Sequence, residues 1–239
     1  MPRVYIHEVV EVEGTRRAHY QHHMTANWVP EGGPLRRQRC FGVFTLVGST
    51  GAWPRVVNIW EYDGWDELAH NFAIEFAGTS HRDPMLEEWW QAAAEFRKGG
   101  FDRILEEHEA NPGIEHWQAR GGTSAVAYAH ERFTVTTGRA RLVADAVADG
   151  GSQYATGSRL ELVGLWRTAM RADDEVIAMW AVPDWETWAS VEERVALNGQ
   201  QHAEVVGLER TLLVDAELSP LRLGRQPETG DRRPISEIG

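Results

Sequence analysis

The sequence contains very little cysteine or lysine and no long apolar run, and each shortage excludes a class of protein. Cys40 is the only cysteine among 239 residues, so no intrachain disulfide can form. The net charge is −12, and no basic cluster is present, which argues against nucleic acid or an anionic membrane as a partner. No stretch approaches the about 18 apolar residues of a membrane-spanning helix, and the chain enters a strand without a charged leader. We therefore expect a cytoplasmic protein.

Several motifs of cofactor chemistry are also missing. The sequence has no phosphate-binding glycine loop, no Gly-x-Ser-x-Gly elbow and no dinucleotide fingerprint after a strand. We therefore expect no nucleotide cofactor. What the chain does contain is an apolar fraction of 42% with 11 Trp, which is typical of a packed globular protein.

The sequence contains an internal repeat, which we call the echo. The stretch from Val56 to Ala69 reads as a strand, a tight turn and a helix start, and 176–189 repeats it at a constant offset without a gap. Other pairs extend the echo: Tyr128-Ala-His-Glu131 matches Tyr5-Ile-His-Glu8, and Leu208-Glu-Arg-Thr-Leu212 matches Phe101-Asp-Arg-Ile-Leu105.

Each half is predicted to run strand, helix, strand, strand, helix, strand. In the first half the strands are expected at 4–12, 40–47, 56–62 and 101–105, and the helices at 15–27 and 65–76, with a further helix opening at Asp83-Pro84. This order predicts an α+β fold of two tandem ferredoxin-like repeats, whose antiparallel sheets pack face to face with helices on the outer faces. The expected divisions are a repeat at 1–107, a linker at 108–122, a repeat at 123–217 and a C-terminal tail at 218–239.

The echoed stretch resembles the NIPSNAP family of the dimeric α+β barrel superfamily. The resemblance lies in Leu46-Val-Gly, in Val-Val-Asn-Ile-Trp-Glu-Tyr-Asp, and in the helix that opens on Trp-Asp-Glu-Leu. It covers residues 3–107 and, more weakly, 124–216. The resemblance implies an intrachain version of that barrel, with a pocket for a small apolar or aromatic molecule, and it favours a homo-oligomer. Relatives in the superfamily include cofactor-free monooxygenases, isomerases, haem-binding dismutases and proteins without an assigned activity.

The first helix differs most between the two halves. It carries His19, Tyr20, His22 and His23 where the second half has aliphatic residues. Tyr20, His23 and Asn27 lie within about 60° on a helix, beside the apolar stripe of Tyr20, Met24 and Trp28. Since imidazole titrates near neutral pH, His23 is the predicted acid or base, and Tyr20 and Asn27 are predicted to orient the substrate. His22 is expected to be solvated.

The first strand offers a second group of candidates. Alternation places Glu8 in an otherwise aliphatic row and His7 on the opposite face. Burial would raise the pKa of Glu8 and make it a usable acid or base. However, the second half retains Glu131 at the matching position, which favours a structural hydrogen-bond acceptor. His7, a further catalytic candidate, is echoed by His130 in the same way.

Pocket walls and ligands complete the predicted site. Trp28, Met24 and Trp89 are the expected walls, and the loop with His81 and Arg82 is an expected lid that holds an anionic group. His19 and His23 have the spacing of metal ligands, although no metal is favoured. No histidine lies in a haem motif, so no cofactor is predicted, with metal or haem as minor alternatives. Cys40 is expected to be a core thiol.

Three hypotheses follow. The leading one is an enzyme that performs acid/base chemistry on a small apolar or aromatic molecule, as an isomerase or a cofactor-free monooxygenase does. The second is a non-catalytic barrel that binds a ligand or oligomerises. The third is a metal- or haem-dependent enzyme.

Overall fold

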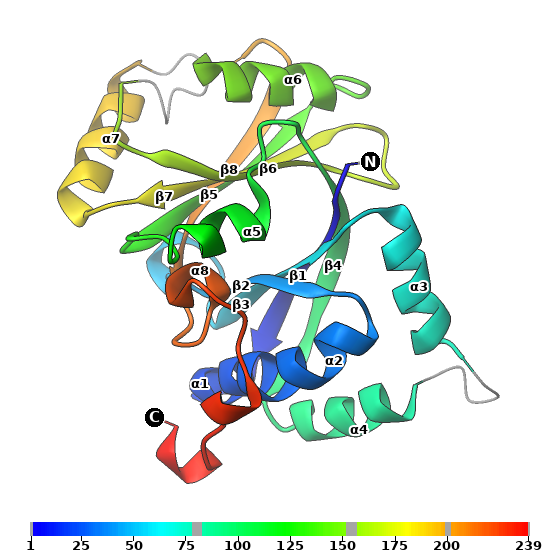
Figure 1. The fold of residues 1–239 in the computed structure, drawn as a ribbon. Helices are drawn as coiled ribbons and strands as arrows, with labels where there is room; N and C mark the ends of the chain where they lie inside the picture. Colours follow the sequence, from blue (N-terminus) through cyan, green and yellow to red (C-terminus); the bar gives the residue numbers. More distant parts are fainter. Residues whose placement is uncertain (1, 78–82, 152–156, 199–201, 239) are drawn as a thin grey trace.

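A computed structural model describes residues 2–77, 83–151, 157–198 and 202–238. Its eight strands form one closed antiparallel barrel in the order β1-β3-β2-β8-β5-β7-β6-β4, with helices on the outside (Figure 1). The strands are β1 Val4–Val12, β2 Arg39–Leu46, β3 Arg55–Tyr62, β4 Arg97–Glu107, β5 Ala127–Val135, β6 Glu161–Thr168, β7 Glu175–Val182 and β8 Val205–Asp215.

The helices alternate with these strands. The α-helices are α1 Arg17–His22, α2 Val29–Leu35, α3 Trp65–Glu75, α4 Pro84–Ala93, α5 Gly113–Ala119, α6 Ala140–Ala146, α7 Trp185–Asn198 and α8 Pro220–Leu223. Two π-helical segments, η1 His23–Trp28 and η3 Val147–Gly151, continue α1 and α6, and short 3₁₀ turns lie at η2 Gly48–Thr50, η4 Thr229–Asp231 and η5 Ile235–Glu237.

The predicted fold of two ferredoxin-like sheets packed face to face is wrong. Strand β2 pairs with β8 and β4 pairs with β6, so hydrogen bonds join all the strands into one ring. Each of these junctions joins strands from different halves of the chain, and periodicity within one strand carries no information about such a partner. A closed ring also removes the sheet edges that two separate sheets would expose.

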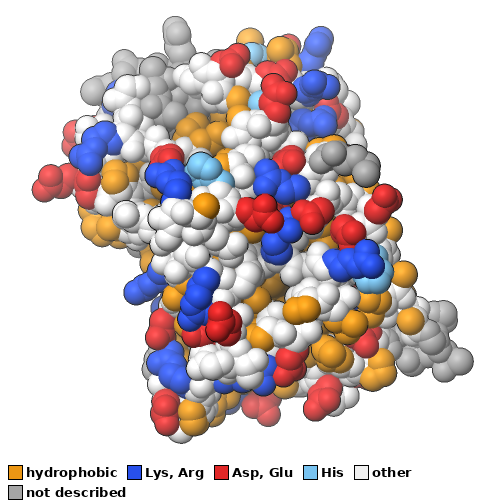
Figure 2. Space-filling model, viewed as in Figure 1, with side chains coloured by type: hydrophobic (Ala, Val, Ile, Leu, Met, Phe, Trp, Pro, Cys, Tyr) orange, Lys and Arg blue, Asp and Glu red, His pale blue; other side chains and the backbone are white. Residues whose placement is uncertain are grey.

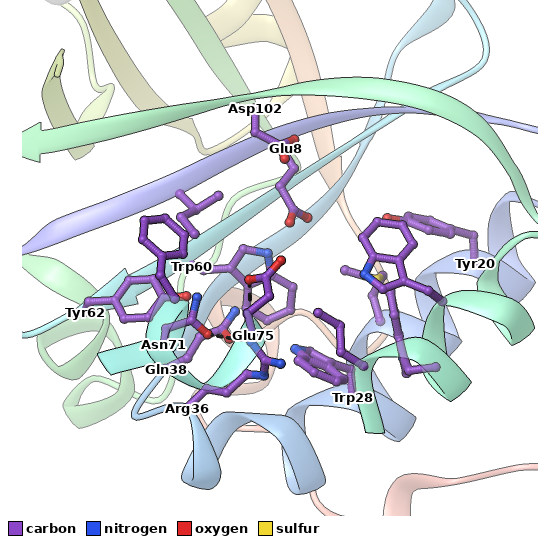
Figure 3. Close-up of a pocket in the computed structure, with 16 residues that line it drawn as sticks. Glu8, Tyr20, Trp28, Arg36, Gln38, Trp60, Tyr62, Asn71, Glu75 and Asp102 are labelled. Carbon is purple, nitrogen blue, oxygen red and sulfur yellow. Dashed lines mark hydrogen bonds and ion pairs between the residues drawn. The ribbon is translucent and has the colours of Figure 1, made fainter. Parts of the chain in front are cut away.

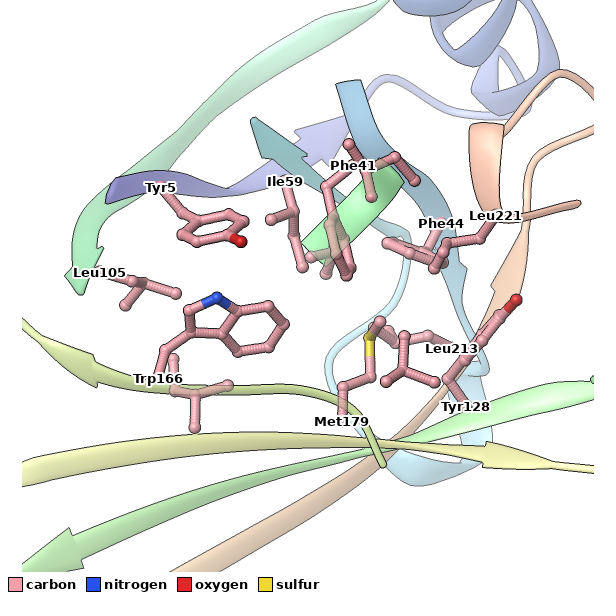
Figure 4. Close-up of a cluster of buried hydrophobic side chains, with 14 of the residues drawn as sticks. Tyr5, Phe41, Phe44, Ile59, Leu105, Tyr128, Trp166, Met179, Leu213 and Leu221 are labelled. Atoms are coloured by element: carbon pink, nitrogen blue, oxygen red, sulfur yellow. The ribbon is translucent and has the colours of Figure 1, made fainter. Parts of the chain in front are cut away.

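Alternation along β1 divides its side chains between two environments. Tyr5 and Val9 face the interior of the barrel, and Val4 and Val10 face the helices outside. Figure 4 shows the interior cluster, in which aromatic rings from both halves of the chain meet. Tyr5 packs edge-on against Trp166 with ring centroids 5.5 Å apart. The barrel interior around Tyr5 and Trp166 is therefore a packed core.

Two segments without a core pattern in the sequence close this end of the barrel. Helix α5, inside the predicted linker, buries Trp117, and α8, inside the predicted tail, buries Leu221. The chain after α8 then returns to β2, where Gln226 hydrogen bonds to the backbone N–H and C=O of Cys40 at 3.0 and 2.9 Å. The domain boundaries proposed from the sequence remain predictions.

The first helix is longer than predicted. It continues through η1 and α2 to Leu35, although Trp28-Val29-Pro30 was expected to end it. Pro30 falls in the first turn of α2, where proline needs no N–H donor and has a suitable φ. Asp83 and Pro84 start α4 as predicted, because the Asp83 carboxylate accepts a hydrogen bond from the Leu86 N–H at 3.3 Å.

The exterior is mixed in charge. Figure 2 shows acidic and basic side chains interspersed on the face it presents, and apolar side chains gathered over α3 and α4. Within the residues that the structure describes, no helix is long and apolar enough to cross a membrane.

Candidate functional site

A pocket lies between the outer face of the barrel and helices α1 to α4. It has a volume of about 150 Å³ and opens to solvent at one side. Figure 3 shows the side chains around it: the strands supply two carboxylates, and the helices supply aromatic rings. The lining residues are Ile6, Glu8, Tyr20, Met24, Trp28, Arg36, Gln38, Trp60, Tyr62, Asn71, Phe72, Glu75, Leu86, Trp89, Trp90 and Asp102.

The helical wall of the pocket comes from Tyr20, Met24 and Trp28. These residues recur every four positions, so one face of α1 and η1 presents all three to the sheet. Trp89 from α4 meets Trp28 with ring centroids 5.2 Å apart. The π-helical turn of η1, a feature that often marks functional sites, carries Met24 and Trp28.

Glu8 is the central polar group of the pocket. Its carboxylate accepts a hydrogen bond from the Asn58 side-chain amide at 2.8 Å, and the same amide donates to the Tyr20 hydroxyl at 3.1 Å. Burial raises the pKa of Glu8 to about 7, and the negative charge of Asp102 acts in the same direction. Hydrogen bonds from Asn58 and Trp60 offset part of this increase. A carboxyl group is therefore close to half ionised at neutral pH.

Asp102 stands directly opposite Glu8 in the β1–β4 ladder. Its pKa is also raised, mainly by burial, while the positive charge of Arg97 opposes the increase. Two neighbouring carboxyl groups in one apolar pocket cannot both ionise readily, so they titrate as a pair. Burial and the charge of Glu8 likewise raise the pKa of Tyr20, which keeps its phenol protonated.

The echoed carboxylate of the second half has a different environment. Glu131 accepts hydrogen bonds from Arg210 at 2.7 Å and from the Trp180 indole at 2.8 Å. Arg210 stands opposite Glu131 in the β5–β8 ladder, at the place where Asp102 stands opposite Glu8. Glu131 therefore has a cation as its cross-strand partner, and Glu8 has an acid.

A second polar group forms the other side of the pocket. Arg36 is 2% exposed and donates hydrogen bonds to Asn71 at 2.9 Å and to Asp83 at 2.8 Å. Glu75 lies 3.6 Å from the same guanidinium, and the Trp28 ring lies 5.4 Å from it. This network ties α2, α3 and α4 together, so it fixes the helices that wall the pocket.

The structure brings part of the predicted site together. Tyr20, Met24, Trp28, Trp89 and Glu8 all line the pocket. These five positions remain predictions as functional residues.

His23 and Asn27 lie behind this pocket wall. The His23 ring stacks on Trp89 at 4.7 Å, and its Nε2 contacts the Trp89 carbonyl at 3.2 Å. Its Nδ1 accepts a hydrogen bond from the Asn27 amide at 3.1 Å. With both nitrogens engaged and its pKa lowered by burial, His23 supports Trp89 rather than facing the cavity.

The other predicted residues are dispersed. His7 lies inside the barrel, on the far side of the sheet from the pocket. His22 is buried, not solvated, because its Nε2 accepts a hydrogen bond from the Arg233 N–H at 3.2 Å. Among the described residues no group of three or more histidine, cysteine or acidic side chains could hold a metal. His81 and Arg82 lie outside the described residues.

Sequence reasoning missed Asp102, Asn58 and Arg36. The echo aligns Asp102 with Glu209, whereas the strand registers align it with Arg210, a shift of one residue. Knowledge of the register would have revealed Asp102 as the partner of Glu8. Asn58 lies within the echoed strand but opposite Glu8 in the β1–β3 ladder, which is also a question of register.

Comparison with known proteins supports the fold. No family model and no curated protein sequence matches the chain. Among solved structures, an anthrone oxidase-like protein is similar with a TM-score of 0.59 and 12% identity, over 98% of this chain and 96% of the other. A candidate monooxygenase from Lactobacillus acidophilus matches with a TM-score of 0.55 and 7% identity, over 96% and 97%. A candidate chlorite dismutase matches with a TM-score of 0.50 and 12% identity, over 90% and 96%.

These neighbours are dimeric α+β barrel proteins, and the chain has that fold. Membership of the NIPSNAP family is not shown. The prediction of no cofactor is overturned, because a candidate chlorite dismutase shares this fold.

The described residues around the pocket do not fit a haem. They include no histidine or cysteine, the Tyr20 phenol stays protonated, and a volume of about 150 Å³ accepts a molecule the size of benzene rather than a macrocycle. Inside the barrel, the Nε2 atoms of His7 and His130 face each other at 3.1 Å, which leaves no place for an iron between them.

Proposed function

We propose that the chain is an enzyme that removes a proton from a small aromatic or apolar substrate in the pocket between α1–α4 and the barrel. The observation that carries this proposal is Glu8, whose pKa lies at about 7 inside an aromatic-walled pocket. A general base is most effective when its pKa is near the working pH. The similar fold of an anthrone oxidase-like protein is compatible with this chemistry.

Glu8 and Tyr20 have different roles in the proposed proton transfer. The Glu8 carboxylate takes a proton from an acidic carbon beside a carbonyl, the C–H bond breaks, and its electron pair moves onto the carbonyl oxygen as an enolate. The Tyr20 phenol, whose pKa is raised, is available as a hydrogen-bond donor to that oxygen. Where the enolate is conjugated with a carbon–carbon double bond of the substrate, returning the proton to the far carbon of that system completes an isomerisation, and we favour this outcome because it needs no further reactant.

The pocket volume limits the substrate. A cavity of about 150 Å³ in an apolar protein interior accepts a molecule the size of benzene. Trp28, Trp60 and Trp89 offer flat faces for one aromatic ring. We therefore propose a substrate with one aromatic ring and a carbonyl group on an adjoining chain or ring. Assembly into a homo-oligomer remains a proposal from the family resemblance.

Deuterium exchange into 2-indanone tests the proposal. This ketone combines one aromatic ring with acidic carbon–hydrogen bonds, and NMR in heavy water follows the exchange. We expect the wild type to accelerate exchange, with a rate that rises with pH and levels off above about pH 7. Glu8→Gln should lower the enzymatic rate by about 100-fold or more, because general base catalysis contributes at least that much.

Matched variants identify the base. Glu131→Gln changes the echoed carboxylate on the other side of the molecule and should leave the rate within about twofold of wild type. His23→Ala, which tests the sequence-based assignment, should mainly weaken binding through the loss of support for Trp89. Exchange that survives Glu8→Gln but disappears in His23→Ala would reverse the assignment. Saturable binding of 2-indanone without any exchange would favour the non-catalytic alternative.

A further inference from the structure

A second, larger cavity lies at the opposite end of the barrel from α5. Its volume is about 520 Å³, and the function proposed above does not use it. Strands β1, β2, β3, β4, β5 and β8 and the turn at η2 surround it. Its lining residues are His7, Val9, Leu46, Thr50, Gly51, Ala52, Arg55, Val57, Phe101, Arg103, His130, Arg132, Glu209, Arg210 and Thr211.

A histidine pair forms the floor of this cavity. The rings of His7 and His130 stack with centroids 5.1 Å apart, and their Nε2 atoms are 3.1 Å from each other. Two neutral imidazoles at this distance share one hydrogen bond, so one ring donates from Nε2 and the other must carry its proton on Nδ1. His7 is completely buried, and its Nδ1 has no hydrogen-bond partner from another described residue.

Arg103 also lines this cavity, and part of its guanidinium group makes no hydrogen bond to the described residues. Its side chain is 13% exposed, and only its Nε is engaged, by Glu175 at 2.8 Å. The guanidinium carbon lies 4.5 Å from the centre of the Phe101 ring. Its two terminal NH₂ groups have no hydrogen-bond partner within the described part of the chain. These NH₂ groups are not among the buried atoms that lack a partner, so they are accessible and can donate hydrogen bonds to water or to a ligand.

The charges around the pair favour an anion. Arg132 divides its contacts between Glu175 and Glu209, and Arg55 contacts Glu11 at the rim. Glu175 also accepts hydrogen bonds from Arg103 and from the Thr168 hydroxyl, so several donors share its single negative charge. Opposite these polar groups, Val9, Leu46 and Val57 form an apolar wall. The cavity therefore combines hydrogen-bond donors on one side with an aliphatic surface on the other.

We propose that this cavity is a binding site for a small organic acid. The carboxylate lies at the free NH₂ groups of Arg103 and at the imidazole N–H of the histidine pair. The apolar body of the acid lies against the aliphatic wall, and the volume falls in the about 300–1,000 Å³ range of small-molecule sites. This site is independent of the Glu8 pocket, which lies on the other side of the sheet.

Binding of the acid is coupled to the uptake of a proton by the histidine pair. Burial and the nearby Arg103 and Arg132 hold the pKa values of both histidines below their ordinary range, and His130 also lowers the pKa of His7. Glu175 acts in the opposite direction on His130, and Glu209, Arg55 and Arg210 are the other charged groups that line the cavity. A bound carboxylate adds a negative charge beside the pair and raises these pKa values. Affinity therefore increases, with uptake of a proton, as the pH falls below the pKa of the pair in the complex, and it levels off near the pKa of the free site, which is about 4 for His130.

Calorimetric titration with benzoate tests the proposal on the full chain. We expect saturable binding that Arg103→Gln weakens at least about tenfold, since a charge-assisted hydrogen bond contributes about 1.5–3 kcal/mol. Arg171→Gln is the matched control, because Arg171 also contacts Glu175, at 3.5 Å, but does not line the cavity. It should leave the affinity within about twofold. Titration in buffers of different ionisation enthalpy should detect proton uptake, which His130→Gln abolishes.

Other probes separate the alternatives. Benzyl alcohol, which lacks the charge, and inorganic phosphate, which lacks the apolar body, should both bind more weakly than benzoate. Equal or tighter binding of either probe would overturn the assignment to organic acids, and equal affinities of Arg103→Gln and Arg171→Gln would overturn the site. If Arg103→Gln fails to fold, Ala52→Trp tests the site instead, because a large side chain at the exposed rim should obstruct the cavity. An unchanged affinity for benzoate in this variant would contradict binding in the cavity.

Discussion

Replacement of Glu8 by glutamine should stabilise the protein at alkaline pH. Folding raises the pKa of Glu8 from its ordinary 4.5 to about 7, so the folded state binds this proton more tightly than the unfolded chain does. The corresponding stability is fully present below about pH 4.5 and is lost as the pH rises through about 7. At about 1.4 kcal/mol for each tenfold change in proton affinity, the loss amounts to about 3 kcal/mol.

Glutamine resembles the protonated carboxyl group and can still accept the hydrogen bond from Asn58. Glu8→Gln should therefore match the wild type near pH 5 and exceed its free energy of unfolding by up to about 3 kcal/mol near pH 8. Urea unfolding followed by tryptophan fluorescence at both pH values measures the difference. Since Glu8 and Asp102 titrate together, the transition reports the pair rather than one group.

Glu131→Gln is the matched control, and its effect should have the opposite sign. It removes the charge that faces Arg210 at 2.7 Å, and breaking a buried ion pair costs about 3–5 kcal/mol. Glu192 lies 3.4 Å from the same guanidinium, so we expect the lower end of that range. A Glu8→Gln variant that is destabilised near pH 8, or whose difference from the wild type is the same at both pH values, would refute the reasoning.

Three further predictions concern other ionisable groups. Asp102→Asn removes the charge opposite Glu8 and should move the pH midpoint of 2-indanone exchange down by about one pH unit; a midpoint that stays or rises contradicts the carboxyl pair. His130→Asn should reduce the acid sensitivity of folding. Because folding lowers the pKa of His130 to about 4, the free energy of unfolding of the wild type falls by up to about 3 kcal/mol as the pH falls from 6.5. Urea unfolding near pH 7 and near pH 4.5 measures this loss, and an equal loss in the variant contradicts the prediction. Cys40 is 1% exposed and burial raises its pKa, so a thiol reagent should label it only at the rate of unfolding, and fast labelling of the native protein would place the thiol at the surface.

Local patterns in the sequence predict local structure well. The β-branched content predicted the limits of β1 at Val4 and Val12, and the Asp83-Pro84 pair predicted the start of α4. The stripe of Tyr20, Met24 and Trp28 predicted one wall of the pocket, since helical spacing determines which side chains share a face. Each of these features depends on residues close together along the chain.

Features that depend on distant strands were not predictable in this way. The ring closes through the β2–β8 and β4–β6 pairs, and no residue pattern within a strand identifies its partner. The histidines of the first helix have the composition of a catalytic group, but His23 turns both nitrogens toward its own neighbours. Composition indicates which groups a helix carries, whereas packing against α4 decides where they point.

The comparison of Glu8 with Glu131 shows why an echoed residue can have two roles. A carboxylate present in both halves suggested a structural acceptor, and Glu131 fits that description because Arg210 neutralises it. Burial raises the pKa of both carboxyl groups, but Arg210 opposes the increase at Glu131, whereas Asp102 adds to it at Glu8. The residue at the cross-strand position therefore decides whether the neighbouring charge opposes the effect of burial or strengthens it. For this reason the single variant Asp102→Arg should keep Glu8 ionised beside a cation and abolish exchange above the background rate, while leaving the Asn58 hydrogen bond in place.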